Sequence, residues 1–323
     1  MSIVMILTRA GRAPVRLAGL AALSMVPLAV FAANGRTCTM RDAAVPTNSI
    51  TYVLCQQGLV LVTSDDGAHW ATRTTGATND LRAIAFLDAS RGFVVGDGGS
   101  LFATADQAKT WQARPAGTKE NLTDIQMIGE QGWVTGFNGL IMHTADGGQT
   151  WSKQNTGTAQ SLEAMHFLDV RNGWAVGWAG TILHTTDGGT TWQPVKSAPA
   201  QWSLSAIYFR DPKEGWIVGF AGQLLHTADG GVTWETKKAP VNSWLTSITF
   251  DRANRGWITT DEGLLLSEDG GGTWRLVPAG LRFVNKLVSA SGAVWALGPF
   301  GMMKQSGAGT EWKKIDNPLS GMA

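Results

Sequence analysis

The sequence of 323 residues lacks an excess of charge of either sign. It has 26 Lys and Arg residues against 25 Asp and Glu residues, which gives a formal net charge of +1. Proteins that bind nucleic acids depend on clustered Lys and Arg, so this balance gives no reason to expect a nucleic-acid partner. The sequence also lacks helical periodicity, a phosphate-binding loop, a metal-ligand set and a cofactor motif, and we expect neither a metal nor a cofactor.

The sequence has little that could span a membrane. Its one long apolar stretch, Leu17 to Ala32, is about 16 residues, shorter than the roughly 20 that a transmembrane helix needs. Three arginines precede it, and small residues flank Phe31, which predicts a signal peptide over residues 1–32 with cleavage after Ala32. The alternative is a retained membrane anchor. Cleavage removes three basic residues and no acidic ones, which changes the formal charge from +1 to −2. We expect a periplasmic or otherwise exported protein with no integral membrane segment.

What the sequence does contain is a repeat. Seven tryptophans follow one another at intervals of 38 to 42 residues: Trp70, Trp111, Trp151, Trp192, Trp234, Trp274 and Trp312. A constant period near 40 residues means that one supersecondary unit is used seven times. Residues 33–323 divide into seven units of about 42 residues, which leaves no linker for a second domain.

Most of these tryptophans end an Asp-containing octapeptide, such as Thr144 to Trp151 with its Asp-Gly-Gly turn. The acidic residue can accept backbone N–H bonds within a hairpin turn while the tryptophan packs under it. We therefore interpret the Asp residues of these boxes as structural. They are Asp65, Asp106, Asp146, Asp187, Asp229 and Asp269.

One repeat, residues 122–155, indicates the secondary structure of all seven. Leu122 to Met127 alternates apolar and polar residues, which is typical of a strand. Gly132 to Gly136 and Leu140 to Thr144 predict a second and a third strand, and Trp151 opens a fourth. Four short strands in each of seven units predict an all-β, seven-bladed β-propeller of Asp-box repeats as a single domain over residues 33–323.

The two cysteines fall in the first repeat. The same pattern places its inner strand near residues 39–45 and its second strand near residues 50–56, with a turn at 47–48. Opposed residues then have numbers that sum to about 95, and Cys38 and Cys55 face one another to within a residue or two. Because an exported chain favours oxidation, we predict a Cys38–Cys55 disulfide; the alternative is two buried thiols.

Three motifs recur in order: Gly-Trp-x-Val-Gly, Gly-x-Leu-x-His-Thr and Thr-x-Asp-Gly-Gly-x-Thr-Trp. All three occur in the repeats at 132–151, 173–192 and 215–234. With them the chain resembles the photosystem II assembly/stability factor family of Asp-box (BNR-type) propellers over residues 48–316. The resemblance implies an exported, non-enzymatic protein that assists assembly of a membrane protein complex. Because relatives occur in bacteria that do not photosynthesise, it does not imply a photosystem.

Photosynthetic members of that family carry a patch of surface arginines. Here the turns between first and second strands carry five arginines on one rim, interleaved with aspartates, which also fits ordinary solvated turns. These arginines are Arg91, Arg171, Arg210, Arg252 and Arg255.

A better candidate for a binding surface comes from propeller topology. Loops between the second and third strands share one face with the loops that join successive blades. Six large aromatic residues fall in these loops: Phe137, Trp178, Trp202, Phe220, Trp244 and Phe300. Exposed aromatic side chains are the usual anchors of an interface, which predicts a partner-docking face. The alternative is that the rings fill the propeller core.

Catalytic constellations are weaker. His143, His184 and His226 occupy one repeat position and so lie in different blades, where they cannot converge on one metal ion. A sialidase needs three convergent arginines and a Tyr nucleophile, and the only tyrosines, Tyr52 and Tyr208, have no obvious acidic partner. Asp124 and Glu163, on adjacent inner strands, are the one carboxylate pair we nominate for glycoside hydrolysis.

The leading hypothesis is thus a non-catalytic exported propeller. It would act as an assembly or scaffolding factor for a membrane-associated protein complex through its aromatic face. The alternative is a carbohydrate-active protein, either a glycoside hydrolase or a glycan-binding propeller, because aromatic faces also stack on sugars.

Overall fold

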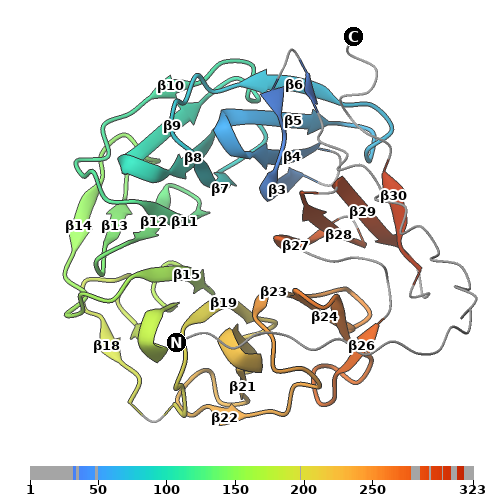
Figure 1. Cartoon of the computed structure of the whole chain (residues 1–323). Helices are drawn as coiled ribbons and strands as arrows, with labels where there is room; N and C mark the ends of the chain where they lie inside the picture. Colours follow the sequence, from blue (N-terminus) through green and yellow to red (C-terminus); the bar gives the residue numbers. More distant parts are fainter. Residues whose placement is uncertain are drawn as a thin grey trace, which may run out of the picture.

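Seven four-stranded antiparallel sheets are arranged as blades in a closed ring (Figure 1). The computed structural model describes residues 32–33, 36–47, 50–196, 198–277, 284–290, 292–299, 301–306 and 311–315. The predicted signal peptide lies almost wholly outside these residues. Among the residues described, no helix has the length and apolar character needed to cross a membrane. The seven four-stranded sheets confirm the all-β, seven-bladed propeller that the repeat predicts.

Each blade consists of four strands that are consecutive in the chain. A short pair, β1 (Ala32–Ala33) and β2 (Arg36–Thr37), precedes them. The strands of blades one to three are β3 (Met40–Thr47), β4 (Ile50–Cys55), β5 (Leu59–Thr63), β6 (Ala71–Thr74); β7 (Leu81–Phe86), β8 (Gly92–Gly96), β9 (Ser100–Thr104), β10 (Gln112–Ala113); β11 (Leu122–Ile128), β12 (Gln131–Gly136), β13 (Ile141–Thr144), β14 (Ser152–Gln154).

The strands of blades four to seven are β15 (Leu162–Phe167), β16 (Gly173–Gly177), β17 (Ile182–Thr185), β18 (Gln193–Pro194); β19 (Leu204–Phe209), β20 (Gly215–Gly219), β21 (Leu224–Thr227), β22 (Glu235–Thr236); β23 (Leu245–Phe250), β24 (Gly256–Thr260), β25 (Leu264–Ser267), β26 (Arg275–Val277); β27 (Lys286–Ala290), β28 (Ala293–Gly298), β29 (Gly301–Ser306), β30 (Lys313–Ile315). Single 3₁₀ turns join second to third strands in four blades: η1 (Gln56–Gly58), η2 (Asp97–Gly99), η3 (Trp178–Gly180), η4 (Phe220–Gly222).

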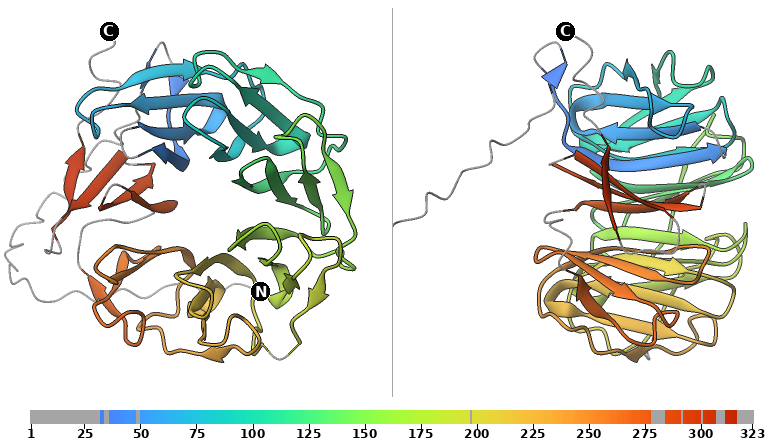
Figure 2. Two further views of the ribbon diagram at one scale, coloured as in Figure 1. Left: turned by 180° about the vertical axis from the view of Figure 1, so that it is seen from behind. Right: turned by 90° about the vertical axis from the view of Figure 1, so that its right-hand side faces the viewer.

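The first strand of every blade lies at the centre of the ring, and the fourth lies at the rim (Figures 1 and 2). Six of the inner strands carry a bulge immediately after their first paired residue, as between Leu122 and Asp124 in β11. A bulge leaves one residue unpaired and re-aims its side chain. The bulged residues are Arg41, Arg82, Thr123, Glu163, Ser205 and Thr246.

Neighbouring blades are held together by the tryptophans of the second strands. Trp133 of β12 is fully buried, stacks on Phe167 of the next blade at 3.8 Å between ring centroids, and donates its Nε1–H to the Gly188 carbonyl at 2.9 Å. Trp174 of β16 stacks on Phe209 in the same way at 4.2 Å. The repeat therefore encodes its own interface, because each blade supplies a ring that the following blade covers.

The ring closes between blade seven and blade one without a shared strand among the described residues. Side chains join the two blades: Trp295 packs edge-on against Trp70, Lys304 forms an ion pair with Asp66, and Asn285 Nδ2 donates to the Met40 carbonyl at 2.7 Å. Trp295 also belongs to the buried cluster that surrounds both cysteines. Closure thus relies on packing and polar contacts between separate sheets.

Candidate functional site

The Asp-boxes form one hydrogen-bonded unit that recurs around the ring. In blade four, Asp187 Oδ1 accepts the backbone N–H of Thr191 at 2.9 Å, and Oδ2 accepts the Thr191 hydroxyl at 2.7 Å. The Thr185 hydroxyl donates to Asp187 and accepts the N–H of Gly189 at 2.8 Å. These bonds stabilise the carboxylate and lower its pKa to about 2 in each of the six predicted boxes. Every box carboxylate is therefore committed to its own turn.

The two cysteines form a disulfide bond. Cys38 lies just before β3, Cys55 ends β4, and their Cα atoms are 5.1 Å apart. Met40 pairs with Cys55 in the antiparallel register, so opposed residue numbers sum to 95 near the bridge. The disulfide fixes the start of the inner strand of blade one, next to the blade that closes the ring.

A central channel of about 270 Å³ is lined by the inner strands of all seven blades. All six bulged residues named above line it, and five of them also line a second hollow. Within the channel, Lys286 Nζ lies 3.2 Å from Asp42 Oδ1, which links blade seven to blade one. The Asp42 side chain is buried, and it also accepts the Ile84 N–H of blade two at 3.1 Å.

The carboxylate pair that the sequence nominates lies in this channel, but both carboxylates have structural partners. Asp124 Oδ2 accepts the Met165 N–H of the next blade at 3.0 Å, and burial raises its pKa. Glu163 Oε1 accepts the indole N–H of Trp178 at 2.6 Å. The channel therefore brings the two residues into one cavity while using each to fix a neighbouring group.

Five of the six predicted docking aromatics lie among the described residues, and four of them are strongly exposed. Trp178, Trp202, Phe220 and Trp244 have exposed fractions of 48 to 50%, whereas Phe137 is partly buried. Phe300 lies outside the described residues. Since a core residue of this size would be almost wholly covered, these four rings do not fill the propeller core.

The aromatic residues form two groups on one face. The first group is Phe137 and Trp178, whose ring centroids are 6.2 Å apart. The Arg82 guanidinium lies beside it, 5.6 Å from the Phe137 ring centroid. The second group is Trp202, Phe220 and Trp244, with successive ring centroids 6.0 and 6.2 Å apart. Bulged residues orient both groups, because Glu163 bonds to Trp178 and Ser205 Oγ accepts the Trp244 Nε1–H at 2.6 Å.

The histidines sit beside the blade tryptophans and do not converge. His143, His184 and His226 pair in register with Trp133, Trp174 and Trp216 in three different blades. Burial lowers the pKa of His143 and of His184. No three His, Cys, Asp or Glu side chains gather as a metal site anywhere in the part of the chain that the structure describes.

Three of the rim arginines, Arg91, Arg210 and Arg255, form ion pairs on the face opposite the aromatic residues. Arg91 contacts Asp88 and Glu130 at 2.7 and 2.9 Å, and Arg255 contacts Asp251 at 2.7 Å. These side chains are consequently neutralised by neighbouring turns. The structure gives no sign of a cationic patch dedicated to an acidic partner at these three positions.

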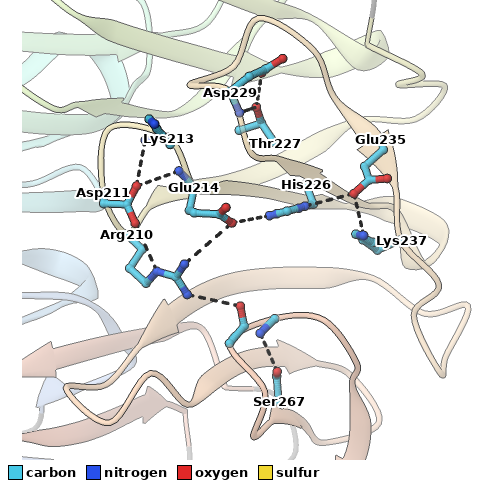
Figure 3. Close-up of polar contacts among 12 residues, drawn as sticks. Arg210, Asp211, Lys213, Glu214, His226, Thr227, Asp229, Glu235, Lys237 and Ser267 are labelled. Carbon is cyan, nitrogen blue, oxygen red and sulfur yellow. Dashed lines mark hydrogen bonds and ion pairs between the residues drawn. The ribbon is translucent and has the colours of Figure 1, made fainter.

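Arg210, the third, begins a chain of polar contacts across blade five (Figure 3). It lies 3.8 Å from Glu214, whose Oε2 is 2.7 Å from His226 Nε2; His226 Nδ1 is 3.2 Å from Glu235, and Glu235 is 2.6 Å from Lys237. Arg210 also donates to Asn254 of blade six. The chain therefore joins two blades and leaves no carboxylate free for another role.

The tyrosines are unsuited to nucleophilic catalysis. Tyr52 is fully buried, stacks on Phe86 at 4.0 Å, and burial raises the pKa of its hydroxyl to about 12. Burial also raises the pKa of Tyr208. A nucleophile needs a lowered pKa or an adjacent base, and these hydroxyls have the opposite environment.

The sequence interpretation missed the bulged residues and the Asp42–Lys286 pair. The only signal for the bulges was the polar residue that follows the first apolar residue of each inner strand, as Thr123 follows Leu122. The ion pair joins residues at opposite ends of the repeat array. Aligning the seven inner strands against one another places Asp42, Asp124 and Lys286 at one repeat position and could have shown this ring of charge.

Comparisons with known proteins agree with this architecture. A family model described as photosynthesis system II assembly factor YCF48 matches residues 66–158, 151–238 and 196–317. Comparison with curated proteins gives no match.

Solved structures of similar shape include YCF48 bound to a D1 peptide (21% identity, TM-score 0.64, 76% of this chain and 85% of that one covered). YCF48 from Cyanidioschyzon merolae is 18% identical, with a TM-score of 0.68 and coverage of 83% and 96%. A GH74 xyloglucanase from Xanthomonas campestris is 13% identical, with a TM-score of 0.71, and the match covers 87% of this chain but 55% of the enzyme. At such identities the structural likeness shows the fold alone. Because the family model spans most of the sequence, the chain belongs to the family of the photosynthesis system II assembly factor YCF48.

Proposed function

We propose that this protein is an exported, non-catalytic assembly factor that binds a polypeptide segment of a membrane-associated protein complex on its aromatic face. Family membership supports an assembly-factor role. A related propeller of known structure is bound to a D1 peptide, which supports a polypeptide as the kind of ligand. The host complex here need not be a photosystem.

The observation that carries the proposal is the exposure of Trp178, Trp202, Phe220 and Trp244 on one face. Large rings that are half exposed leave apolar surface in contact with water. Partner binding would remove that surface from water, with a favourable free energy of about 25 cal/mol per Å². Hydrogen bonds from two of the indoles to Glu163 and Ser205 already fix the rings in place. A preorganised aromatic surface lowers the entropy lost on binding.

The test is crosslinking in intact cells, followed by affinity purification of the tagged mature protein and mass spectrometry. Wild type is compared with a Trp202→Ala, Trp244→Ala variant. The control is a Val170→Ala, Val232→Ala variant, which removes exposed apolar side chains at sites away from the aromatic face. We expect a defined membrane complex with wild type and control, and its loss with the tryptophan variant. Recovery of no protein partner would contradict the proposal.

A carbohydrate-active protein is the second candidate, and one observation favours it. Asp124 and Glu163 line one cavity, and burial raises the pKa of Asp124 as a general acid would require. The test is hydrolysis of xyloglucan and other β-glucans by wild type and by the Asp124→Asn and Glu163→Gln variants. Turnover that both substitutions abolish would establish this reading, and its absence would remove it.

A further inference from the structure

The three rings over blade five form a regular ladder. Phe220, in the 3₁₀ turn η4, lies between Trp202, which precedes β19, and Trp244, which precedes β23. The two centroid separations are 6.0 and 6.2 Å, and successive ring planes cross at 65° and 75°. Each ring is about half exposed and packs edge-on against the next, so the ladder presents three adjoining exposed rings.

Two polar groups of the ladder residues are bonded within the protein. The Nε1–H of Trp244 is bonded to Ser205 Oγ, and the backbone N–H of Trp202 donates to Gln223 Oε1 at 2.9 Å. What Phe220 and Trp244 offer outward is therefore apolar, and the orientation of the Trp244 ring is set before any partner arrives. A ladder of this kind recognises side chains by shape and spacing rather than by hydrogen bonds.

The spacing matches an extended polypeptide. A β-strand rises about 3.3 Å per residue and points alternate side chains to the same side, so every second side chain is roughly 6.6 Å from the last. Rings at nearly that interval can each receive one side chain of a strand, whereas a helix about 10 Å across needs a continuous trough.

The loops beside the ladder add a charge preference. The two loops that carry Trp202 and Trp244 contain exposed Lys196 and Lys238 and no Asp or Glu between residues 194 and 203 or between 237 and 244. Lys237 is already paired with Glu235. Among the described residues of these two loops, the charged side chains beside the Lys237–Glu235 pair are thus positive, which favours carboxylates in the bound segment.

Resting on the proposed function, we propose that the partner segment binds in extended conformation along Trp202, Phe220 and Trp244. Its apolar side chains occur at every second residue and pack on the exposed rings of the ladder, and acidic residues accompany them. The inference concerns the kind of segment recognised, whichever complex supplies it.

Three capped, dye-labelled synthetic peptides of equal length test this with the purified mature protein by fluorescence anisotropy. One has leucine at every second position with glutamate between; the second has the same composition rearranged as a Leu-Leu-Glu-Glu repeat, whose four-residue period suits a helix; the third has lysine in place of glutamate. We expect the first to bind at least about tenfold more tightly than either of the others, a difference of about 1.4 kcal/mol.

The Trp202→Ala, Trp244→Ala variant is expected to lose this binding, while the Val170→Ala, Val232→Ala control, checked for folding by circular dichroism, keeps it. A Lys196→Glu, Lys238→Glu variant is expected to lose the preference for glutamate over lysine. Equal affinity for the first two peptides, or preference for the helical spacing, would overturn the inference. Ladder-dependent binding to phosphatidylglycerol vesicles without peptide discrimination would overturn it too, and would assign the face to lipid.

The two proposals can fail separately. If the cellular complex is lost in the tryptophan variant but the peptides bind alike, the extended-segment inference is wrong and the assembly role stands. If the cellular complex survives in the tryptophan variant, the aromatic face is not the docking site and both proposals fail.

Discussion

Replacing Trp133 with phenylalanine tests whether the tryptophans of the second strands stabilise the contact between neighbouring blades. The ring is fully buried, and its Nε1–H donates to the Gly188 carbonyl of the next blade at 2.9 Å. Trp174 occupies the same repeat position, is equally buried, and its Nε1 has no partner among the described residues. Trp174→Phe is therefore a matched control that changes ring size by the same amount without breaking a hydrogen bond.

The expected difference follows from hydrogen-bond accounting. Trp133→Phe removes a bond with a net contribution of about 0.5–1.5 kcal/mol. The Gly188 carbonyl keeps a second donor, Gln154 Nε2 at 3.1 Å, so it is not left unpaired. Trp174→Phe removes an unpaired buried donor, whose presence costs about 1–3 kcal/mol in the wild type. The loss of ring size is common to both variants and cancels, so Trp133→Phe should be less stable by at least about 1 kcal/mol.

Thermal unfolding followed by far-UV circular dichroism measures this difference without relying on tryptophan emission. For a domain of this size 1 kcal/mol corresponds to about 2–4 °C in the melting temperature, and we expect a gap of at least that size. Equal melting temperatures, or a lower one for Trp174→Phe, would show that the Trp133–Gly188 bond does not hold the two blades together.

Three further outcomes are expected. The six box aspartates have a pKa of about 2 in the fold against about 3.9 unfolded, so their stabilisation is complete above pH ~4 and is lost as the pH falls toward 2; a melting temperature that does not fall across this window would refute it. Reducing the Cys38–Cys55 bond, which spans 17 residues, should lower stability by about 3 kcal/mol, seen as a lower urea midpoint that a Cys38→Ser, Cys55→Ser variant reproduces without reductant. Gly231→Ala would place a Cβ 2.5 Å from Trp174 Nε1, whereas Gly157→Ala meets nothing within 4 Å at a similar positive φ; the first should lower the melting temperature well beyond the roughly 1 kcal/mol of backbone strain that both share, and equal effects would contradict the packing argument.

Much of the architecture could be predicted because the repeat states it seven times. The strand boundaries predicted for residues 122–155 agree with β11 to β14 to within about a residue, since alternation and glycine turns are local signals. The pairing of Met40 with Cys55 follows from the same local arithmetic. Such features depend on chain neighbours and need no knowledge of the closed ring.

The polar contacts inside the channel could not be predicted in this way. Asp42 and Lys286 meet only because the ring closes, and their common repeat position becomes visible only when the inner strands of the first and last repeats are aligned. The bulge that turns Glu163 toward Trp178 depends on the register of two strands and leaves only a faint trace in the sequence. Exposure was also undetermined, because Trp133 and Trp178 are the same residue type and only their strand and loop positions decide that one is core and the other surface.

The position of the ring seam has an evolutionary consequence. Where a ring is closed by a sheet that contains strands from both ends of the chain, a unit can be gained or lost only if that shared sheet forms again. Here each sheet is complete within one continuous stretch of sequence, and the boundary between repeats coincides with the boundary between blades. A gene segment of about 40 codons therefore encodes a whole structural module, which can be copied, lost or moved as a unit. Trp202 and Trp244 lie at such boundaries, where individual repeats differ from one another in sequence.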